Sequence, residues 1–188
     1  MDKAINLQPN LAENYRNRAW VYLTLDQIPK AVADLEKATE LKQDDAFTYY
    51  CLGWVQKVLK EYTKALESFQ QVVKMVPNDE QVHLEIAGVY KALHQYENVV
   101  AVMTKIIQIN PQNLEAYYQR GFFYNRLKQY QQAIGDFNRV IELQPKCGEA
   151  YLQRGFSYLY LKNEEKAKAD FLEAVRINPC FYEKIPII

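Results

Sequence analysis

The sequence predicts an all-α solenoid of antiparallel helix pairs, because short motifs and single residues recur in it at one fixed spacing. The stretch EAYYQRGFFY at 115–124 returns as EAYLQRGFSY at 149–158, 34 residues later, with eight of ten residues unchanged. Prolines recur on the same spacing, at Pro9, Pro77, Pro111, Pro145 and Pro179. A period of roughly 20–50 residues is typical of repeat architectures, in which each unit buries its apolar face against the next.

The spacing divides the chain into five complete repeats when the recurring proline is placed at position 32. The predicted boundaries are 12–45 (repeat 1), 46–79 (repeat 2), 80–113 (repeat 3), 114–147 (repeat 4) and 148–181 (repeat 5). Residues 1–11 correspond to the tail of a partial repeat, and residues 182–188 form a C-terminal tail. We expect one continuous repeat domain.

Positions 1–14 of each repeat are expected to form a first helix. Positions 4, 8 and 11 fall on one helix face, since spacings of three and four residues return to the same side. Position 8 is always Gly or Ala, and position 11 is Tyr in every repeat but the second. Acidic residues complement the helix dipole in the first turn, at Glu13, Glu80, Glu115 and Glu149. The residues just ahead are candidate N-caps, at Asp45, Asp79 and Asn113.

Positions 15–28 are expected to form a second helix, because positions 17, 20, 24, 27 and 28 also share one face. Position 20 is Ala in four repeats and Val99 in repeat 3, so neighbouring helices can approach closely there. Pro29 falls in the first turn of a second helix, where proline is tolerated. The recurring proline ends the second helix because it cannot donate a backbone hydrogen bond.

This pattern resembles the tetratricopeptide repeat, which favours an aromatic residue at position 4, Leu-Gly at 7–8, Tyr at 11, Ala at 20, Phe at 24 and Pro at 32. The resemblance covers residues 12–179 and implies a right-handed solenoid of five complete repeats after an N-terminal partial repeat. Repeat 3 departs from the pattern with His83 at position 4 and Gly88 at position 9. We expect it to be the least stable repeat or the most locally distorted one.

Composition excludes several classes of function. Lys plus Arg equals Asp plus Glu, 23 of each, whereas nucleic-acid binders carry a basic domain or stripe, so no nucleic acid is expected as partner. No apolar run approaches the roughly 20 residues of a membrane span, so no membrane insertion is expected. Three widely spaced cysteines, Cys51, Cys147 and Cys180, suit free thiols in a reducing compartment, and the protein is expected to be cytoplasmic.

The chain carries no recognisable catalytic motif. His83 and His94 are its two histidines, and neither has a cysteine or carboxylate at metal-ligand spacing. Cys51 lies on a helix face and could be reactive, although nothing in the sequence lowers its pKa. We therefore expect no enzyme, no catalytic residue, no metal and no cofactor.

A second stripe on the first helices, at positions 2, 5, 9 and 12 with position 13 beside them, lines a concave groove that holds peptide segments in the family this chain resembles. Aromatic and Arg side chains are the usual anchors of protein recognition. The predicted groove residues are Arg16, Trp20, Tyr50, Trp54, Tyr118, Phe122, Asn125, Arg126 and Phe156. Large side chains at position 9 could instead only pack neighbouring first helices together. The arginines at position 7 (Arg18, Arg120, Arg154) are expected to pair with acidic neighbours rather than with a ligand.

The sequence thus predicts a non-catalytic protein–protein interaction module, or scaffold, that binds a peptide segment of a partner in an aromatic-lined groove. One alternative is a regulatory or assembly segment cut from a larger enzyme or from a transport or secretion complex, since residues 1–11 match only part of a repeat. Another is a scaffold that self-associates into a homo-oligomer through uncapped ends, because the C-terminal stretch CFYEKIPII is apolar. This tail could also fold back over the last apolar face.

Overall fold

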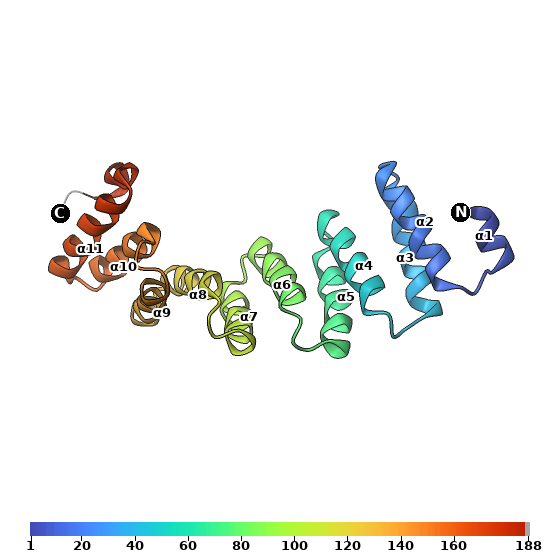
Figure 1. The fold of residues 1–188 in the computed structure, drawn as a ribbon, viewed down its shortest axis with the longest axis horizontal. Coiled ribbons are helices and arrows are strands. Elements are labelled where there is room, and N and C mark those ends of the chain that lie inside the picture. The colour runs from blue at the N-terminus through green and yellow to red at the C-terminus, as the bar shows by residue number, and fades with distance from the viewer. Residues whose placement is uncertain (187–188) are drawn as a thin grey trace. The chain divides into compact units, whose positions relative to one another are not determined.

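A computed structural model describes residues 1–186, and within this range the chain consists of helices joined by short turns, without a strand (Figure 1). A short helix, α1 (Asp2–Leu7), comes first. The first helices of the repeats are α2 (Ala12–Thr24), α4 (Ala46–Val58), α6 (Glu80–Ala92), α8 (Leu114–Arg126) and α10 (Gly148–Tyr160). The second helices are α3 (Ile28–Leu41), α5 (Tyr62–Met75), α7 (Tyr96–Ile109), α9 (Tyr130–Leu143) and α11 (Glu164–Ile177). A 3₁₀ helix, η1 (Pro179–Lys184), follows them. The predicted all-α class of helix pairs is confirmed.

The second helices begin and end two residues later than the sequence suggested, at positions 17–30 instead of 15–28. They begin later because position 15 adopts the left-handed conformation in every repeat, with φ between 55° and 62° at Asp26, Lys60, His94, Lys128 and Lys162. In repeats 2 to 5 they end later because proline at position 32 restricts only the residue before it, which is the residue after each second helix. In repeat 1, where Gln43 stands at position 32, α3 ends at the same position without a proline.

The left-handed residue closes each first helix with the same hydrogen bond. The backbone N–H at position 16 donates to the carbonyl at position 11, as from Gln129 to Tyr124 at 2.8 Å and from Asn163 to Tyr158 at 2.9 Å. This six-residue closure satisfies carbonyl groups that the helix end would otherwise leave unpaired. At the other end, Asp45 and Asn113 cap α4 and α8 as predicted, by accepting from backbone N–H groups three residues later.

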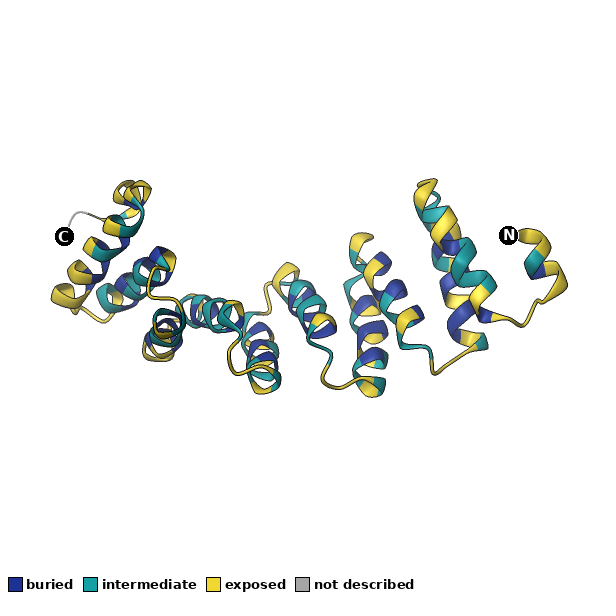
Figure 2. Ribbon diagram, viewed as in Figure 1, coloured by how far each residue is buried: buried dark blue, intermediate teal, exposed yellow. Residues whose placement is uncertain are grey.

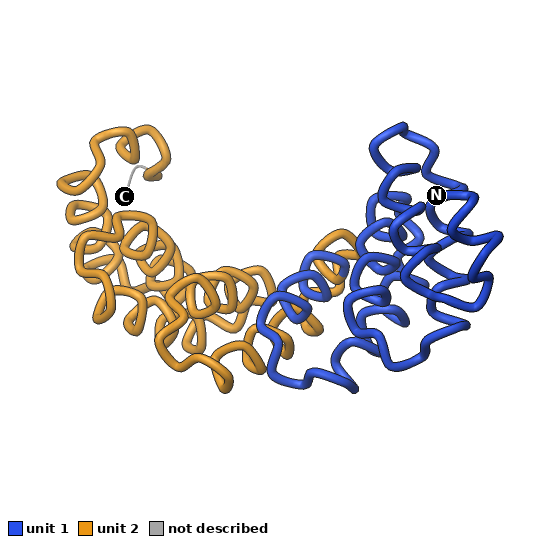
Figure 3. Tube along the Cα trace, turned by 45° about the vertical axis from the view of Figure 1, so that its right-hand side comes forward, with its two compact units in different colours: residues 1–89 blue, residues 90–188 orange. Residues whose placement is uncertain are grey.

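The chain divides into two compact units, residues 1–89 and residues 90–188, which we call the N-unit and the C-unit (Figure 3). In the N-unit, α2 packs against α3, α3 against α4 and α4 against α5. In the C-unit, α7 packs against α8, α8 against α9, α9 against α10 and α10 against α11. Buried residues line the faces along which these helices meet, and exposed residues lie on the turns and outer faces (Figure 2). The repeat boundaries stay a prediction, because helix pairing alone does not show where one unit ends.

Glycine at position 8 permits close contact between the paired helices, as expected. A Cβ atom added at Gly155 would lie 2.6 Å from Cε1 of Phe171, and one added at Gly53 would lie 2.8 Å from the ring of Phe69. These phenylalanines occupy position 24 of the second helix and are almost completely buried. The small residue and the large ring therefore form one interlocking contact.

Arginine at position 7 makes a two-pronged ion pair with aspartate at position 23 in three repeats, which confirms that these arginines pair with acids. The oxygen–nitrogen distances are 2.7–2.8 Å, in the pairs Arg18–Asp34, Arg120–Asp136 and Arg154–Asp170. The third nitrogen of each guanidinium bonds a polar side chain at position 25 of the preceding second helix, namely Asp2, Thr104 or Asn138. Each arginine thus ties three helices together. Repeats 2 and 3 carry Leu52 and Ser68, and Ile86 and Val102, at positions 7 and 23.

Part of the C-terminal stretch CFYEKIPII folds back over the last helix pair, which is one of the alternatives stated for this stretch. Phe181 in η1 is buried with Leu152, Phe171 and Ala174, and its ring lies against Gly148. Ile187 and Ile188, the last residues of the predicted tail 182–188, lie outside the described residues. No helix in the described range is both long and apolar enough to cross a membrane.

Candidate functional site

The nine predicted groove residues fall into two sets, one in each compact unit. The N-unit holds Arg16, Trp20, Tyr50 and Trp54, on α2 and α4. The C-unit holds Tyr118, Phe122, Asn125, Arg126 and Phe156, on α8 and α10. The two sets are described separately.

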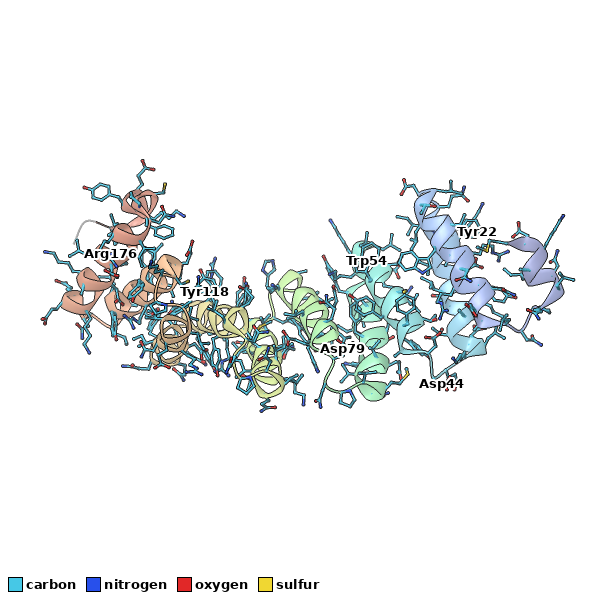
Figure 4. The ribbon with its side chains drawn as sticks, in the orientation of Figure 1. Tyr22, Asp44, Trp54, Asp79, Tyr118 and Arg176 are labelled. Carbon is cyan, nitrogen blue, oxygen red and sulfur yellow. The ribbon has the colours of Figure 1, made fainter. Side chains whose placement is uncertain are left out.

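The two indoles of the N-unit remain largely open to solvent. Trp20 is 44% exposed and Trp54, which projects from α4 (Figure 4), is 41% exposed. Val58, one helical turn beyond Trp54, is also exposed. Packing between neighbouring first helices therefore accounts for only part of each indole surface. Exposed aromatic side chains of this size are typical of recognition surfaces.

The polar groups of the N-unit set already have partners inside the protein. Arg16 Nη1 lies 2.6 Å from Oδ2 of Asp45, the residue that caps α4, and its guanidinium lies over the ring of Phe47. The Tyr50 hydroxyl donates to Glu85 Oε1 at 3.3 Å, and Lys57 pairs with the same carboxylate. Arg16 and Tyr50 thus hold first helices together, and the indoles supply the open surface.

The C-unit set surrounds a cavity of about 290 Å³ between α8 and α10. Its lining residues are Phe122, Asn125, Arg126, Gln153, Phe156 and Tyr160. Four predicted residues therefore meet at one place. Gln153 and Tyr160 were not predicted as site residues. Tyr160 occupies position 13, as Arg126 does, so the repeat register already places it on the stripe, whereas Gln153 at position 6 gives no such signal.

Contacts behind the cavity fix the positions of its aromatic walls. Phe122 meets Phe123 edge to face, with ring centroids 5.3 Å apart, and Phe156 meets Phe171 at 5.2 Å. Tyr160 stacks on Tyr130 with a centroid distance of 4.9 Å. Such ring pairs contribute roughly 0.5–1.5 kcal/mol beyond burial, so the walls are held in place before any ligand arrives.

Asn125 joins the two helices that form the cavity. Its Nδ2 donates to the carbonyl oxygen of Gln153 at 3.3 Å, and its Oδ1 accepts from the Ser157 hydroxyl at 2.8 Å. Both ends of the amide are therefore engaged with α10. Asn125 lines the cavity but sets the spacing of α8 and α10.

Arg126 is the cation of the cavity, and it is exposed. Its guanidinium carbon lies 5.4 Å from the centre of the Phe122 ring. Within residues 1–186 it makes no ion pair, and none of the lining residues is acidic. The cavity thus combines apolar walls with one unneutralised positive charge.

The remaining predicted groove residue, Tyr118, and the cysteine and histidine considered for chemistry lie away from this cavity. Tyr118 on α8 is half-buried against Phe137, and burial raises the pKa of its hydroxyl to about 12 (Figure 4). Burial also raises the pKa of the Cys51 thiol to about 11, which disfavours the reactivity that its helix position allowed. His83 is buried, and its Nε2 lies 2.9 Å from the carbonyl oxygen of Pro77. The described residues include no cluster of three or more His, Cys, Asp or Glu side chains suited to a metal ion.

The helix pairs and the solvent-facing stripe on the first helices define a class, the helical-repeat proteins, in which each unit stacks on its neighbours. Family models described as tetratricopeptide repeat match residues 12–45, 42–79, 114–147 and 148–179. The chain therefore belongs to the tetratricopeptide-repeat family, as the sequence pattern indicated.

Solved structures with the same fold cover nearly the whole chain. YrrB, described as a tetratricopeptide-repeat protein with an unusual peptide-binding site, is 25% identical, with a TM-score of 0.78 over 98% of this chain and 97% of YrrB. MamA is 16% identical, with a TM-score of 0.76 over 94% of this chain and 97% of MamA. MamA from Desulfovibrio magneticus RS-1, from residue 41 onward, is 21% identical, with a TM-score of 0.72 over 90% and 96%. No curated protein matches the sequence. The structural likeness supports the α-solenoid class.

Proposed function

We propose that the protein is a non-catalytic interaction module that binds a peptide segment of a protein partner. The observation that carries this proposal is the cavity between α8 and α10, in which two phenylalanines and an unpaired arginine face solvent together. A cavity of about 290 Å³ lies just below the range of roughly 300–1,000 Å³ typical of small-molecule sites. It therefore suits one or two side chains of a peptide. The peptide-binding site described for YrrB, which shares this fold, supports the proposal.

In this proposal, the aromatic side chains supply most of the binding energy and the polar ones set direction. Phe122 and Phe156 are the apolar anchors of the C-unit, because their rings are fixed from behind. Trp20 and Trp54 are the anchors of the N-unit. At protein interfaces a few residues, often aromatic or arginine, each cost about 2 kcal/mol or more of binding energy when they are truncated.

The partner in this proposal is another protein. The repeat protein itself acts in a reducing compartment such as the cytoplasm. The formal net charge is zero, which gives no general attraction for nucleic acid. The three cysteines are free thiols, which persist where glutathione and thioredoxin keep them reduced.

The test is selection of peptide ligands from a random-peptide display library by the intact protein. Phe122→Ala combined with Phe156→Ala should abolish enrichment of the peptides that the wild type selects. Tyr182→Ala is the matched control, because Tyr182 is an exposed aromatic residue in η1 that does not line this cavity. Helical circular dichroism and the melting temperature check that each variant is folded. Equal enrichment by the wild type and the double variant would contradict the proposal.

Self-association is a second candidate, and one observation favours it. A larger, mainly apolar cavity of about 690 Å³ lies on α11 and η1, bordered by Leu172, Val175, Tyr182 and Ile185. Leu172 is 64% exposed there. Multi-angle light scattering over a hundredfold range of protein concentration tests this alternative, and a mass equal to one chain throughout would exclude it.

A further inference from the structure

We propose that the cavity between α8 and α10 selects a peptide segment in which an aspartate or glutamate side chain is flanked by large apolar residues. Arg126 pairs with the carboxylate, while Phe122, Phe156 and Tyr160 take the flanking side chains. This inference rests on the proposed function, whose peptide ligand it specifies.

The first step is the ion pairing of Arg126 compared with that of the other arginines. The chain has seven arginines. In the described residues six of them lie within ion-pair distance of a carboxylate, at Arg16, Arg18, Arg120, Arg139, Arg154 and Arg176. Arg126 alone has an aromatic ring beneath it and no acid beside it. An unpaired arginine at a cavity keeps its N–H donors free to pair with an anionic group of a ligand.

The second step is the orientation of the guanidinium. A guanidinium that lies over an aromatic face is favoured by the ring's negative face, and its N–H donors point outward in its own plane. Those donors match the two oxygens of a carboxylate in a planar, two-pronged pair. Phe122 therefore orients the Arg126 guanidinium for a two-pronged pair with a carboxylate. A lysine ammonium group at this position would offer only a point charge.

The third step is the uniqueness of the position. Arg126 occupies position 13, the last residue of a first helix. The corresponding residues of the other repeats are Thr24, Val58, Ala92 and Tyr160. Only repeat 4 therefore places a cation there, so that one acidic residue of the ligand is specified and the register of the peptide along the C-unit is fixed.

The fourth step separates a side-chain carboxylate from the carboxylate of a chain terminus. Arg126 and Phe122 lie on α8, and Phe156 and Tyr160 lie on α10. An acidic residue within a segment has neighbours on both sides, which can reach both helices. A terminal carboxylate has a neighbour on one side only and would leave one aromatic wall unused. We therefore assign the site to an internal acidic residue.

The experiment is a comparison of peptides selected from the random display library by wild-type protein, Arg126→Gln and Arg126→Glu. Wild-type protein should enrich Asp or Glu next to Phe, Tyr, Leu or Ile. Arg126→Gln should lose the acidic preference, and Arg126→Glu should replace it by a preference for Lys or Arg. Arg176→Gln is the matched control, because Arg176 is an exposed arginine far along the chain on α11 (Figure 4).

A synthetic peptide from the wild-type selection then gives the size of the effect by fluorescence anisotropy. Replacing its acidic residue by the corresponding amide should weaken binding to the wild type about fivefold to tenfold and leave binding to Arg126→Gln unchanged, since each change removes the same pair. About 1 M salt should reduce the wild-type difference, because the Debye length falls to about 3 Å. Amidation of the peptide's C-terminus should have no effect.

The outcomes separate this inference from the proposed function. Selected peptides that depend on Phe122 and Phe156, but show no acidic preference and bind Arg126→Glu equally well, would overturn the inference and leave the proposed function standing. Loss of binding on C-terminal amidation would also overturn it, in favour of a terminal carboxylate. If wild-type protein selects no peptide, both are wrong.

Discussion

At the scale of single residues, the environment decides what an arginine does in this protein. Arg154 on α10 is held between two oxygens of Asp170 and bonds Asn138 of the preceding helix. Arg126, on the neighbouring first helix, has no such acid and faces a cavity. The position within the repeat makes the difference, because an aspartate at position 23 reaches an arginine at position 7 of its own repeat and does not reach one at position 13.

The first prediction concerns the buried ion pair of repeat 5. Asp170→Val leaves the Arg154 guanidinium without its carboxylate and should lower the free energy of unfolding by about 3 kcal/mol, because one charge of a largely buried pair stays uncompensated. Arg154→Ile with Asp170→Val copies the residues that repeat 3 carries at these positions, Ile86 and Val102, and should recover most of the loss. Urea unfolding followed by circular dichroism measures both. A double variant less stable than the single one would contradict this prediction, because it would show that an apolar pair cannot replace the ion pair.

The second prediction concerns the thiols. At pH 8, iodoacetamide should modify the exposed Cys180 well before the buried Cys51, whose pKa of about 11 keeps it protonated and whose burial blocks access. Mass spectrometry of peptides after timed alkylation gives the rates. In denaturant the two thiols should react equally. Rapid alkylation of Cys51 in the native protein would show that α4 opens locally.

Sequence reasoning at this scale succeeded where partners lie within one repeat and was incomplete where they do not. The pairing of Arg18, Arg120 and Arg154 with acids follows from charge and spacing. The pairing of Arg16 with Asp45 crosses from repeat 1 to the cap of repeat 2, and no local spacing announces it. For the same reason, the role of Asn125 as a link to Gln153 and Ser157 could not be read from position 12 alone.

At the scale of helices, contact between paired helices depends on a small residue facing a large one. Gly155 on α10 lies against Phe171 on α11, whereas Gly135 on α9 has open space where a side chain would be. Both glycines lie inside helices, so they carry the same conformational cost and differ only in their surroundings.

The third prediction uses that contrast. Gly155→Ala places a Cβ 2.6 Å from the Phe171 ring, which must shift, and should destabilise the protein by about 1–3 kcal/mol. Gly135→Ala meets nothing and should stabilise it by about 0.5–1 kcal/mol, because alanine loses less backbone entropy in a helix. Chemical denaturation of the two variants side by side measures the difference. Equal effects of the same sign would contradict this view of the contact.

Helix existence and pairing were predictable from the sequence, but the helix ends were not. The 3.6-residue periodicity places every first and second helix in the right order. The turn between them depends on a left-handed residue that is never glycine, and in three repeats it is a lysine, which does not signal that conformation as Asp26 and His94 do. The predicted start of the second helix was therefore two residues too early.

At the scale of the whole molecule, stability in a repeat protein is roughly a sum of repeat and nearest-neighbour contributions, so that it varies along the chain. Repeat 3 combines several weak features. Gly88 lies inside α6 with only the end of Lys57 within 4 Å. Positions 7 and 23 lack the ion pair of repeats 1, 4 and 5, a feature that repeat 3 shares with repeat 2. The division between the N-unit and the C-unit also falls within α6, after Val89.

The fourth prediction follows from these features. Backbone amides of residues 80–113 should exchange with deuterium faster, and at a lower opening free energy, than those of repeats 2 and 4. Gly88→Ala should slow this exchange by adding about 1 kcal/mol of helix propensity. Hydrogen exchange followed by mass spectrometry resolves the repeats. Uniform protection along the chain would show that repeat 3 is as stable as its neighbours.

The arginine ties also restrict how such a chain can lengthen by tandem duplication. Each arginine at position 7 needs a polar side chain at position 25 of the repeat before it, which Asn138 provides for Arg154. A duplicated copy of repeat 4 would meet this requirement. A copy of repeat 5 placed after itself would set its arginine against Leu172, whose aliphatic side chain accepts no hydrogen bond. The order of the repeats is therefore constrained, because position 25 of each repeat must suit position 7 of the repeat that follows it.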